Sequence, residues 1–419
     1  MKEVPSPGKK SVTLFLLGLA LLIVGNVCAA DSSEAREGWI VGGVPALGYN
    51  SDKGFNYGVV LELYNFGDGS RYPNYRHGIH AEWSKTTRGS TVGDLFVEVP
   101  GILGSDLRVT AHLKCLIQLL QPYYGLNGYQ TPYKREYEKE GADEYINRVY
   151  YTTDRDLWQS AITVQGPIRN HWNWVTGIGW FDIHVGPTQV EKIDDDLPEE
   201  TLYSNAVASG RLPHEQADGG EAGYAMMGFV YDSRDRERTP TDGIWSEGLV
   251  TRFSSRLGSE FDFTILTLTH RQYFPLAEDN LTLATRAILQ KNIAGRTPAY
   301  IMPYLMSSRK SIEGLGGSQT IRGVLQNRVV GESVVMANLE MRWRVHRIEI
   351  FNQEFYATLN GFVDTGRVVD VPDDRFHNGI GLGFSVVMNQ NIVGSIDVAK
   401  GLDVRDGFGG IYFHSGYLF

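Results

Sequence analysis

The feature that most limits the fold is a strict alternation of side-chain character between residues 107 and 119. Apolar side chains occupy every second position from Leu107 to Leu119, and polar or charged side chains fill all but one of the positions between them. A repeat of two residues is the period of a β-strand, whereas one face of a helix repeats every 3.6 residues. The segment is therefore predicted to be a strand with one apolar and one polar face.

Residues 334–345 indicate which environment the polar face of such a strand must contact. One face of this segment is apolar throughout, and the other carries Glu340, Arg342 and Arg344. Lipid cannot solvate an acid and two arginines, so this face requires a water-filled or protein-filled lumen. The two segments together predict an all-β membrane protein that spans the bilayer as a barrel.

The first 30 residues have the organisation of a secretory signal peptide. Lysines precede an apolar run, Val12–Val24, and small residues ending at Ala30 follow it. We predict cleavage after Ala30, which leaves a short segment, 31–38, ahead of a barrel that occupies residues 39–419. A retained helical anchor is the weaker alternative, because the run is shorter than the roughly 20 apolar residues that a span needs.

Composition excludes several classes of protein. The net charge of −10 argues against a nucleic-acid partner, and Cys115 is the only cysteine left after the predicted cleavage, so no intramolecular disulfide can form. We find no Gly-x-Ser-x-Gly motif and no cysteine and histidine cluster with metal-ligand spacing, so we expect no enzyme, no cofactor and no metal site. The 48 glycines and 22 tyrosines suit an outer-membrane barrel with aromatic girdles.

Scanning for alternating segments bounded by turn residues gives about 16 candidate strands. We therefore predict a 16-stranded antiparallel transmembrane β-barrel of the outer-membrane type. The candidates centre on Trp39–Ala46, Tyr57–Phe66, His77–Lys85, Asp94–Pro100, Leu107–Leu119, Leu157–Gln165, Trp174–Val185, Tyr224–Arg234, Ile244–Phe253, Phe261–Phe274, Leu281–Lys291, Val334–Val345, Glu354–Asp364, Gly379–Met388, Ile392–Lys400 and Phe408–Phe419.

The lengths of the connections test this count independently. Strands of a barrel alternate in direction, so short turns collect at the periplasmic side and long loops collect outside. The three longest connections lie near 120–154, 187–222 and 292–332, and each follows an odd-numbered strand. The second of them carries an acidic stretch, Asp194–Asp196 with Glu199 and Glu200, which is a solvated loop or, less simply, a weak divalent-cation site.

Four short motifs in the second half of the chain resemble the BamA/TamA superfamily of outer-membrane assembly and translocation barrels, also called bacterial surface antigens. The resemblance covers mainly residues 223–419, and the motifs occur in the family's order. They are FVYDSRD followed after four residues by PTDG (229–243), GGSQTIRGV (316–324), NLEMRWRV (338–345) and FVDTG (362–366).

The resemblance implies a loop lock inside the lumen. In the family the GGSQTIRGV-type loop folds back into the barrel, so Arg322, followed by Gly323, would pair with Glu340 and Asp364. Alternation alone also places both acids on the inner face, and the planar guanidinium suits carboxylates. The alternative is an exposed loop arginine, whose ion pairs contribute only about 0–1 kcal/mol.

Other residues of the resembled motifs carry structural roles. Gly316, Gly317 and Ile321 would shape the loop, and the turn motif after the eighth strand would be formed by Asp232, Arg234, Pro240 and Gly243. Two departures stand out. Only residues 31–38 precede the first strand, which leaves no room for the family's periplasmic POTRA domains, and Val324 replaces the usual aromatic.

The seam between the first and last strands closes the barrel and is predicted to be weak. Gly42 and Gly43 fall in the first strand and Gly409 and Gly410 in the last, and glycine weakens strand pairing because it adds backbone entropy and no cross-strand contact. Weak closure would let the barrel open sideways into lipid. The alternative is that small residues only accommodate curvature or a bulge.

The chain ends in an aromatic strand pattern. Phe419 and Tyr417 continue the alternation of Phe413 and Ile411, so all four are expected on one face of the last strand. Such a terminus is similar to the signal by which outer-membrane proteins are recognised by their assembly machinery.

The leading functional hypothesis follows from the resemblance. The chain would act in the outer membrane of a Gram-negative bacterium, in contact with lipid and lipopolysaccharide, in outer-membrane protein insertion or polypeptide translocation. Separate periplasmic or lipoprotein subunits would replace the missing domains and deliver client polypeptides. The competing hypothesis is a passive pore or structural barrel without insertase activity.

Overall fold

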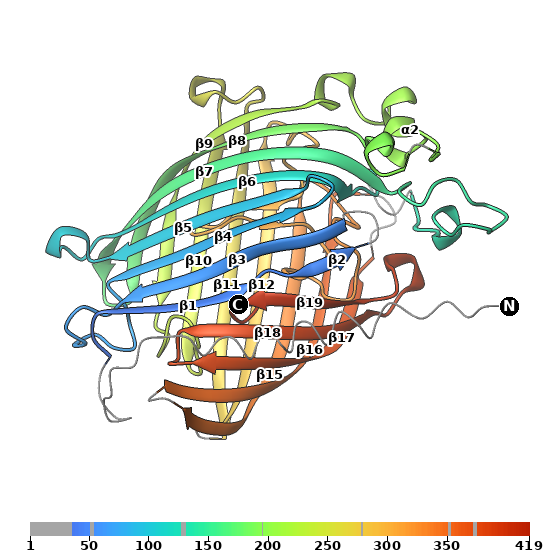
Figure 1. Cartoon of the computed structure of the whole chain (residues 1–419). Coiled ribbons are helices and arrows are strands. Elements are labelled where there is room, and N and C mark those ends of the chain that lie inside the picture. Colours follow the sequence, from blue (N-terminus) through green and yellow to red (C-terminus); the bar gives the residue numbers. More distant parts are fainter. Residues whose placement is uncertain are drawn as a thin grey trace, which may run out of the picture.

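The described chain forms one large antiparallel sheet that curves into a barrel (Figure 1). The predicted signal peptide and residues 31–35 lie outside the described residues. The computed structural model describes residues 36–50, 54–126, 131–194, 196–277, 280–350, 353–371 and 375–419.

Each wall strand pairs with the next one along the chain. Both β1 and β2 pair with β3, so they are two halves of a single wall strand, and the predicted 16-stranded antiparallel wall is confirmed. The strands are β1 (Trp39–Pro45), β2 (Gly48–Asn50), β3 (Gly54–Asn65), β4 (His77–Thr86), β5 (Thr91–Pro100), β6 (Arg108–Pro122), β7 (Thr152–Arg169), β8 (Trp172–Pro187), β9 (Gly219–Asp232), β10 (Gly243–Phe253), β11 (Phe263–Ala277), β12 (Leu281–Ala294), β15 (Val334–Ile350), β16 (Gln353–Val368), β17 (His377–Met388), β18 (Ile392–Gly401) and β19 (Gly410–Ser415).

The remaining elements are short and lie in the connections. In the described parts of the chain they are a two-stranded hairpin, β13 (Tyr304–Leu305) with β14 (Ile312–Glu313), and one α-helix, α2 (Leu202–Ala208). Single turns of 3-10 helix lie at Ile102–Gly104, Arg135–Tyr137, Val190–Lys192, His214–Gln216, Ser255–Leu257 and Val404–Asp406. Thr201 caps α2 by accepting a hydrogen bond from the backbone of Ser204. None of the helices in the described residues is long and apolar enough to cross a membrane.

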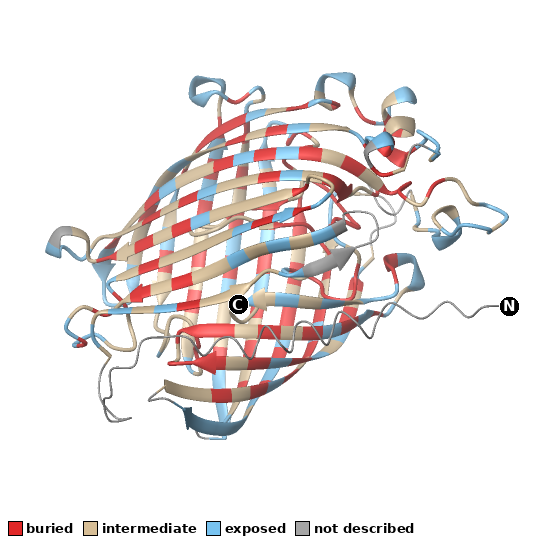
Figure 2. Cartoon of the chain, viewed as in Figure 1, coloured by how far each residue is buried: buried red, intermediate tan, exposed pale blue. Residues whose placement is uncertain are grey.

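Burial alternates along the strands as the sequence predicts, and Figure 2 shows the resulting chequered pattern. In β15, Leu339, Met341 and Trp343 are exposed to the outside, while Glu340 and Arg342 between them are buried. The strands therefore present an apolar face to lipid and a polar face to the lumen.

Strand β6 departs from the predicted alternation at its end. The register with β7 shifts between Gln118 and Gln121, and at this irregularity the consecutive residues Leu119 and Leu120 are both buried. Leu119, which the alternation placed on the outer face, is buried with Val149 and Val190 of the long connections. A bulge places two residues opposite one and so resets the side-chain phase.

The long connections are those predicted, and they leave the wall at one end. They span residues 123–151, 188–218 and 295–333, and each follows an odd-numbered wall strand. We call this the loop end and the opposite end the turn end. Residues 295–333, here named the lumen loop, do not stay outside, because Tyr304 and Met306 lie in a buried cluster with wall residues.

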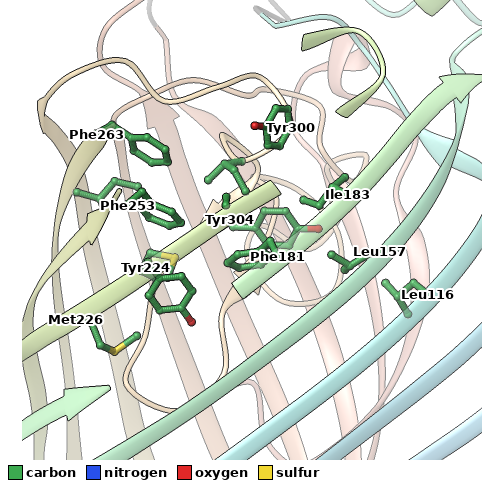
Figure 3. Close-up of a cluster of buried hydrophobic side chains, with 14 residues drawn as sticks. Leu116, Leu157, Phe181, Ile183, Tyr224, Met226, Phe253, Phe263, Tyr300 and Tyr304 are labelled. Carbon is green, nitrogen blue, oxygen red and sulfur yellow. The ribbon is translucent and has the colours of Figure 1, made fainter. Parts of the chain in front are cut away.

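That cluster makes one side of the lumen apolar (Figure 3). Phe181 of β8 packs against Tyr304 with ring centroids 5.0 Å apart, and Phe253 stacks on Phe263 at 4.2 Å. Leu116, which the sequence placed on a polar inner face, is buried in the same cluster. Buried apolar surface of this kind stabilises the packing of the lumen loop against the wall by about 25 cal/mol for each Å² covered.

Candidate functional site

The arginine motif of the lumen loop begins with a tight glycine turn. Gly316 has a φ of +102°, and a Cβ at this position would lie 1.9 Å from the carbonyl oxygen of Leu325, so only glycine fits. The Thr320 hydroxyl closes the turn by bonding both the N–H and the carbonyl oxygen of Gly316, each at 2.9 Å. Gly317 also has a positive φ, and Ile321 is fully buried beside it. The turn holds Arg322 toward the wall.

Arg322 is 1% exposed and is surrounded by acids. It forms a bidentate pair with Asp364 of β16, at 2.8 and 3.0 Å, and Nη1 donates to Asp397 of β18 at 2.8 Å. Glu340 of β15 lies 3.5 Å from Nη2, and the guanidinium stands 3.4 Å from the centre of the Phe362 ring. The predicted contacts with Glu340 and Asp364 are both present. We call these three acids the acid wall.

Asp397 is the residue that the sequence analysis missed. It lies on the inner face of β18, where alternation would have placed it, but no resembled motif includes it. It also accepts from Nε2 of His414 at 3.3 Å, and a Cβ at Gly383 would lie 2.1 Å from its Oδ1. The acid wall thus depends on a glycine in the neighbouring strand.

Gly323 and Val324 fix the loop behind Arg322. The Gly323 N–H donates to the Tyr412 hydroxyl of β19 at 2.9 Å, and a Cβ on Gly323 would stand 2.5 Å from the backbone carbon of Lys400. Val324 is buried in an apolar cluster with Ile288 and Met336. The valine therefore fills a core position, although the resembled family uses an aromatic there.

The tip of the lumen loop is held on the other side of the barrel, by β5, β7 and β10, here named the opposite wall. Arg155 of β7 donates to both oxygens of Glu313, at 2.7 and 3.0 Å, and to the Tyr304 hydroxyl. Arg309 pairs with Glu98 of β5, and Lys310 lies 2.9 Å from Asp94. The loop therefore bridges the lumen from wall to wall.

The turn motif after β9, residues 233–242, closes the turn end. Arg234 pairs with Asp232 at 2.8 Å, and Gly243 has a φ of +98° that leaves its missing Cβ 2.3 Å from the carbonyl oxygen of Ser233. Pro240 is buried in the same turn. These residues shape the turn, as the resemblance implies.

The same turn reaches strands far from its own. Glu237 lies 2.8 Å from Arg108 at the start of β6, and Arg238 lies 3.6 Å from Glu62 of β3. The Thr239 hydroxyl donates to the backbone of Gln390, between β17 and β18, at 3.0 Å. Because β17 is the sixth wall strand after β9, the turn crosses the mouth of the barrel.

Comparison with known proteins identifies the family. Residues 112–416 match the Omp85 superfamily domain, which is well over half of the chain. The chain belongs to the Omp85 superfamily. No curated protein has a significantly similar sequence.

Solved structures share the fold of this Omp85 barrel. BamA from Haemophilus ducreyi lacking POTRA domains 1–3 aligns with a TM-score of 0.50 at 15% identity, covering 91% of this chain and 70% of that one. CdiB from Escherichia coli aligns with a TM-score of 0.54 at 13% identity, covering 89% of this chain. The chain spans 61% of the length of that CdiB.

The seam of the Omp85 barrel lies between β1 with β2 and β19, which Figure 1 draws side by side. The sheet order places β19 beside β2, and β19 is only six residues long, whereas β15 and β16 share a register of 16 paired positions. At the seam, Gly42 faces β18, because a Cβ there would lie 2.5 Å from the Ile392 side chain.

The surroundings of each seam glycine differ, so each glycine has its own local explanation. Gly43 lies in β1, where a Cβ would meet the Leu61 side chain at 2.8 Å. Gly410 begins β19, but Gly409 precedes the strand, with a φ of +96° that places it in a turn. The expectation that Gly409 lies within the last strand is therefore wrong.

The end of the Omp85 chain also differs from expectation. Strand β19 stops at Ser415, and residues 416–419, here named the tail, turn into the lumen. Ile411 and Phe413 are exposed on the outer face as predicted, but Phe419 is buried with Tyr273 and Ala284 of the far strands β11 and β12. Gly416, with a φ of +96°, makes this turn, which the period-two pattern could not reveal.

Proposed function

We propose that this Omp85 barrel inserts proteins into the outer membrane, or passes polypeptides through it, by opening sideways at the seam between β1 and β19. The observation that carries the proposal is the combination of a seam made by short strands, the six-residue β19 against the divided first strand, and a lumen that is bridged by protein. A barrel that works through its seam needs an opening in the wall and needs no open channel.

The energetics of the wall favour the seam as the opening. Strands β15 and β16 share a register from Val334↔Val368 to Ile350↔Gln353, and breaking it would expose a long row of backbone hydrogen-bond groups to lipid. Each unpaired backbone group in hydrocarbon costs several kcal/mol. Opening therefore costs least where such a ladder is short, as it is along the six-residue β19.

The bridged lumen disfavours the passive-pore alternative. The lumen loop reaches both walls through Arg322 and Arg155, and the turn at residues 233–242 crosses the mouth. A wide, steady ion current through the barrel would require both the lumen loop and the turn to move out of the lumen.

The proposal also covers the location of the protein and the partners with which it works. We infer that the precursor is exported by its N-terminal signal peptide, that lipid and lipopolysaccharide surround the apolar outer face, and that separate periplasmic or lipoprotein subunits deliver client polypeptides. The activity involves no covalent chemistry, so the protein is proposed to be a transport or insertion factor and not an enzyme.

A disulfide between β1 and β18, which would hold the seam closed from both sides of β19, tests the proposal. Cysteines at Gly42 and Ile392 suit it, because a Cβ at position 42 would lie 3.3 and 3.4 Å from the branch carbons of Ile392, where a cysteine sulfur would sit. The variant would also carry Cys115→Ser and be reconstituted in liposomes with an unfolded eight-stranded barrel as client. We expect the oxidised form to lose the acceleration of client folding and the reduced form to regain it.

The matched control places cysteines at Leu113 and Ser160, which face each other in the paired strands β6 and β7. Oxidation of this pair should leave the acceleration unchanged. If the seam disulfide forms and client folding is still accelerated, lateral opening is not the mechanism. High steady conductance in planar bilayers would instead support the passive pore.

A further inference from the structure

Two histidines lie beside the aspartate through which the opposite wall holds Lys310. Nε2 of His112 in β6 lies 3.1 Å from Oδ2 of Asp94, and Nε2 of His80 in β4 lies 4.0 Å from Oδ1 of the same carboxylate. The Nζ of Lys310 donates to that Oδ1 at 2.9 Å. One carboxylate is therefore shared by a lysine that is charged at neutral pH and by two rings that can become charged.

The register of the strands brings these groups together. His80 is paired with Phe96 of β5, and Phe96 is paired with His112, so the three rings form one row across the inner face of the sheet. Asp94 precedes Phe96 by two residues and lies on the same face. The Nζ of Lys310 stands 5.0 Å from the centre of the Phe96 ring. The lysine therefore lies over the ring that separates the two histidines.

The hydrogen bonds of each histidine show which ring nitrogen is free to take a proton. A carboxylate only accepts, so Nδ1 of His80, 2.8 Å from Glu62, and Nε2 of His112 carry hydrogen when the rings are neutral. The remaining nitrogens are Nε2 of His80, 4.0 Å from Asp94, and Nδ1 of His112, which is buried without a hydrogen-bond partner among the described residues. Each ring can therefore gain a proton and keep the hydrogen bond that holds it.

The charged groups around the two rings balance while the rings are neutral. They come from the neighbouring strands, from the turn at residues 233–242 and from the lumen loop, and Tyr64 adds an uncharged hydroxyl. The groups are Glu62, Glu82, Asp94 and Glu98 on the acidic side and Lys114, Arg238, Arg309 and Lys310 on the basic side, with Arg108 and Glu237 as a further pair beyond Glu98. Since these formal charges cancel, a proton on each histidine would leave two uncompensated positive charges beside Lys310.

Protonation of the histidines weakens the contact of Lys310 in two ways. A proton on Nε2 of His80 turns this nitrogen into a second donor for Oδ1 of Asp94, and both charged rings repel the ammonium group. The side chains of His80 and Lys310 are 15% and 33% exposed, so water in the lumen reaches both. The rings are fixed on wall strands, whereas the lysine belongs to a loop, so the lysine is the group that leaves.

We propose that His80 and His112 form a pH-sensitive switch that controls the position of Lys310. At neutral pH the rings are uncharged, and Lys310 stays bound to Asp94. At mildly acidic pH the rings become charged and displace Lys310 into the lumen, while Arg322 stays bound at the acid wall. Histidine is the side chain that ordinarily changes its charge in this range. Because release removes a positive charge from beside both rings, proton uptake and release of the lysine favour each other.

The mobility of a spin label next to Lys310 tests the switch. Ser311→Cys, in a chain that also carries Cys115→Ser, is labelled with a nitroxide that does not titrate, and the full barrel is measured in detergent at about pH 7.5 and about pH 5. We expect the ratio of mobile to immobilised label to rise reversibly by about tenfold or more, since one linked proton allows up to tenfold per pH unit. Heat-modifiable mobility on gels at both pH values checks that the barrel stays folded.

Three variants assign the response to the two histidines. His80→Gln combined with His112→Gln keeps hydrogen-bonding groups beside Glu62 and Asp94 but cannot become charged, so the label should stay immobilised at low pH. His184→Gln, which changes a histidine that is 72% exposed on β8, is the matched control and should leave the response intact. Lys310→Gln removes the displaced charge and should also abolish the response, in a barrel whose wall is unchanged.

Two outcomes would overturn the switch. The first is equal mobility of the label at both pH values in the parent chain. The second is a pH response that persists after either the double histidine substitution or Lys310→Gln, which would assign the titration to a carboxylate. The measurement needs no client polypeptide, so its result does not depend on the proposed function.

Discussion

The lumen loop is attached to the barrel at two places that differ in solvation. At the acid wall, Arg322 and its three carboxylates are each no more than 1% exposed. At the opposite wall, the side chains of Arg309 and Lys310 are 25% and 33% exposed. The acid wall is closed to solvent, whereas part of the opposite wall is accessible to it.

This difference indicates that the loop is held permanently at the acid wall and reversibly at the exposed part of the opposite wall. Removing one partner of a fully buried ion pair strands a charge without water, which costs about 3–5 kcal/mol, whereas partly exposed pairs contribute about 0–1 kcal/mol. The carboxylates at the opposite wall also have other partners, since Glu98 bonds Arg108 and Tyr75 as well as Arg309. We therefore infer that Arg309 and Lys310 can leave the opposite wall while Arg322 and Arg155 stay in place.

The largest effect is expected from Arg322→Ala. The variant leaves Glu340, Asp364 and Asp397 together without their shared cation, at a cost of about 3–5 kcal/mol. The lumen loop should become protease-sensitive, and heat-modifiable mobility on gels should weaken. Arg296→Ala, an exposed arginine at the start of the same loop, is the matched control. Unchanged protease resistance of the Arg322 variant would argue against a permanent attachment at the acid wall.

An intermediate effect is expected from Arg155→Met. Arg155 and Glu313 are both nearly buried, but Gln121 and Asn327 also donate to Glu313 and would keep it partly satisfied. We expect a loss of about 2–3 kcal/mol in resistance to denaturant, with protease cuts confined to the loop tip. Arg169→Met, exposed at the end of the same strand, is the control. Cuts spreading to residues 316–324 would show that the two attachments are not independent.

The smallest effect is expected from Arg309→Ala combined with Lys310→Ala. Each side chain is partly solvated, so the loss should be about 0–1 kcal/mol for each pair and should shrink further when salt is added. The measurement is loop proteolysis with and without added salt. A loss as large as that of Arg322→Ala would remove the distinction between the two walls.

Alternation predicted the wall of the barrel well, because lipid and lumen impose opposite demands on neighbouring side chains. It placed Glu340 and Asp364 inward, and the resemblance supplied Arg322 as their partner. Alternation could not identify Asp397 as a third partner of Arg322. The curvature of the sheet decides which inward-facing acids come close to the same arginine. The bulge in β6, the apolar lumen around Leu116 and the inward turn of the tail also escaped it, because each depends on packing between segments far apart in the sequence.

The position of Gly323 has a consequence for the order in which the chain folds. Its backbone lies directly against Lys400 of β18, and its N–H donates to the Tyr412 hydroxyl of β19. Since Asp397 of β18 and Tyr412 of β19 are partners of this motif, we expect the loop to dock before the last strands pair around it. Time-resolved proteolysis during refolding should show the loop protected before β18 and β19. The lumen loop then serves as the template on which the final strands assemble, and the seam becomes the last part of the barrel to form.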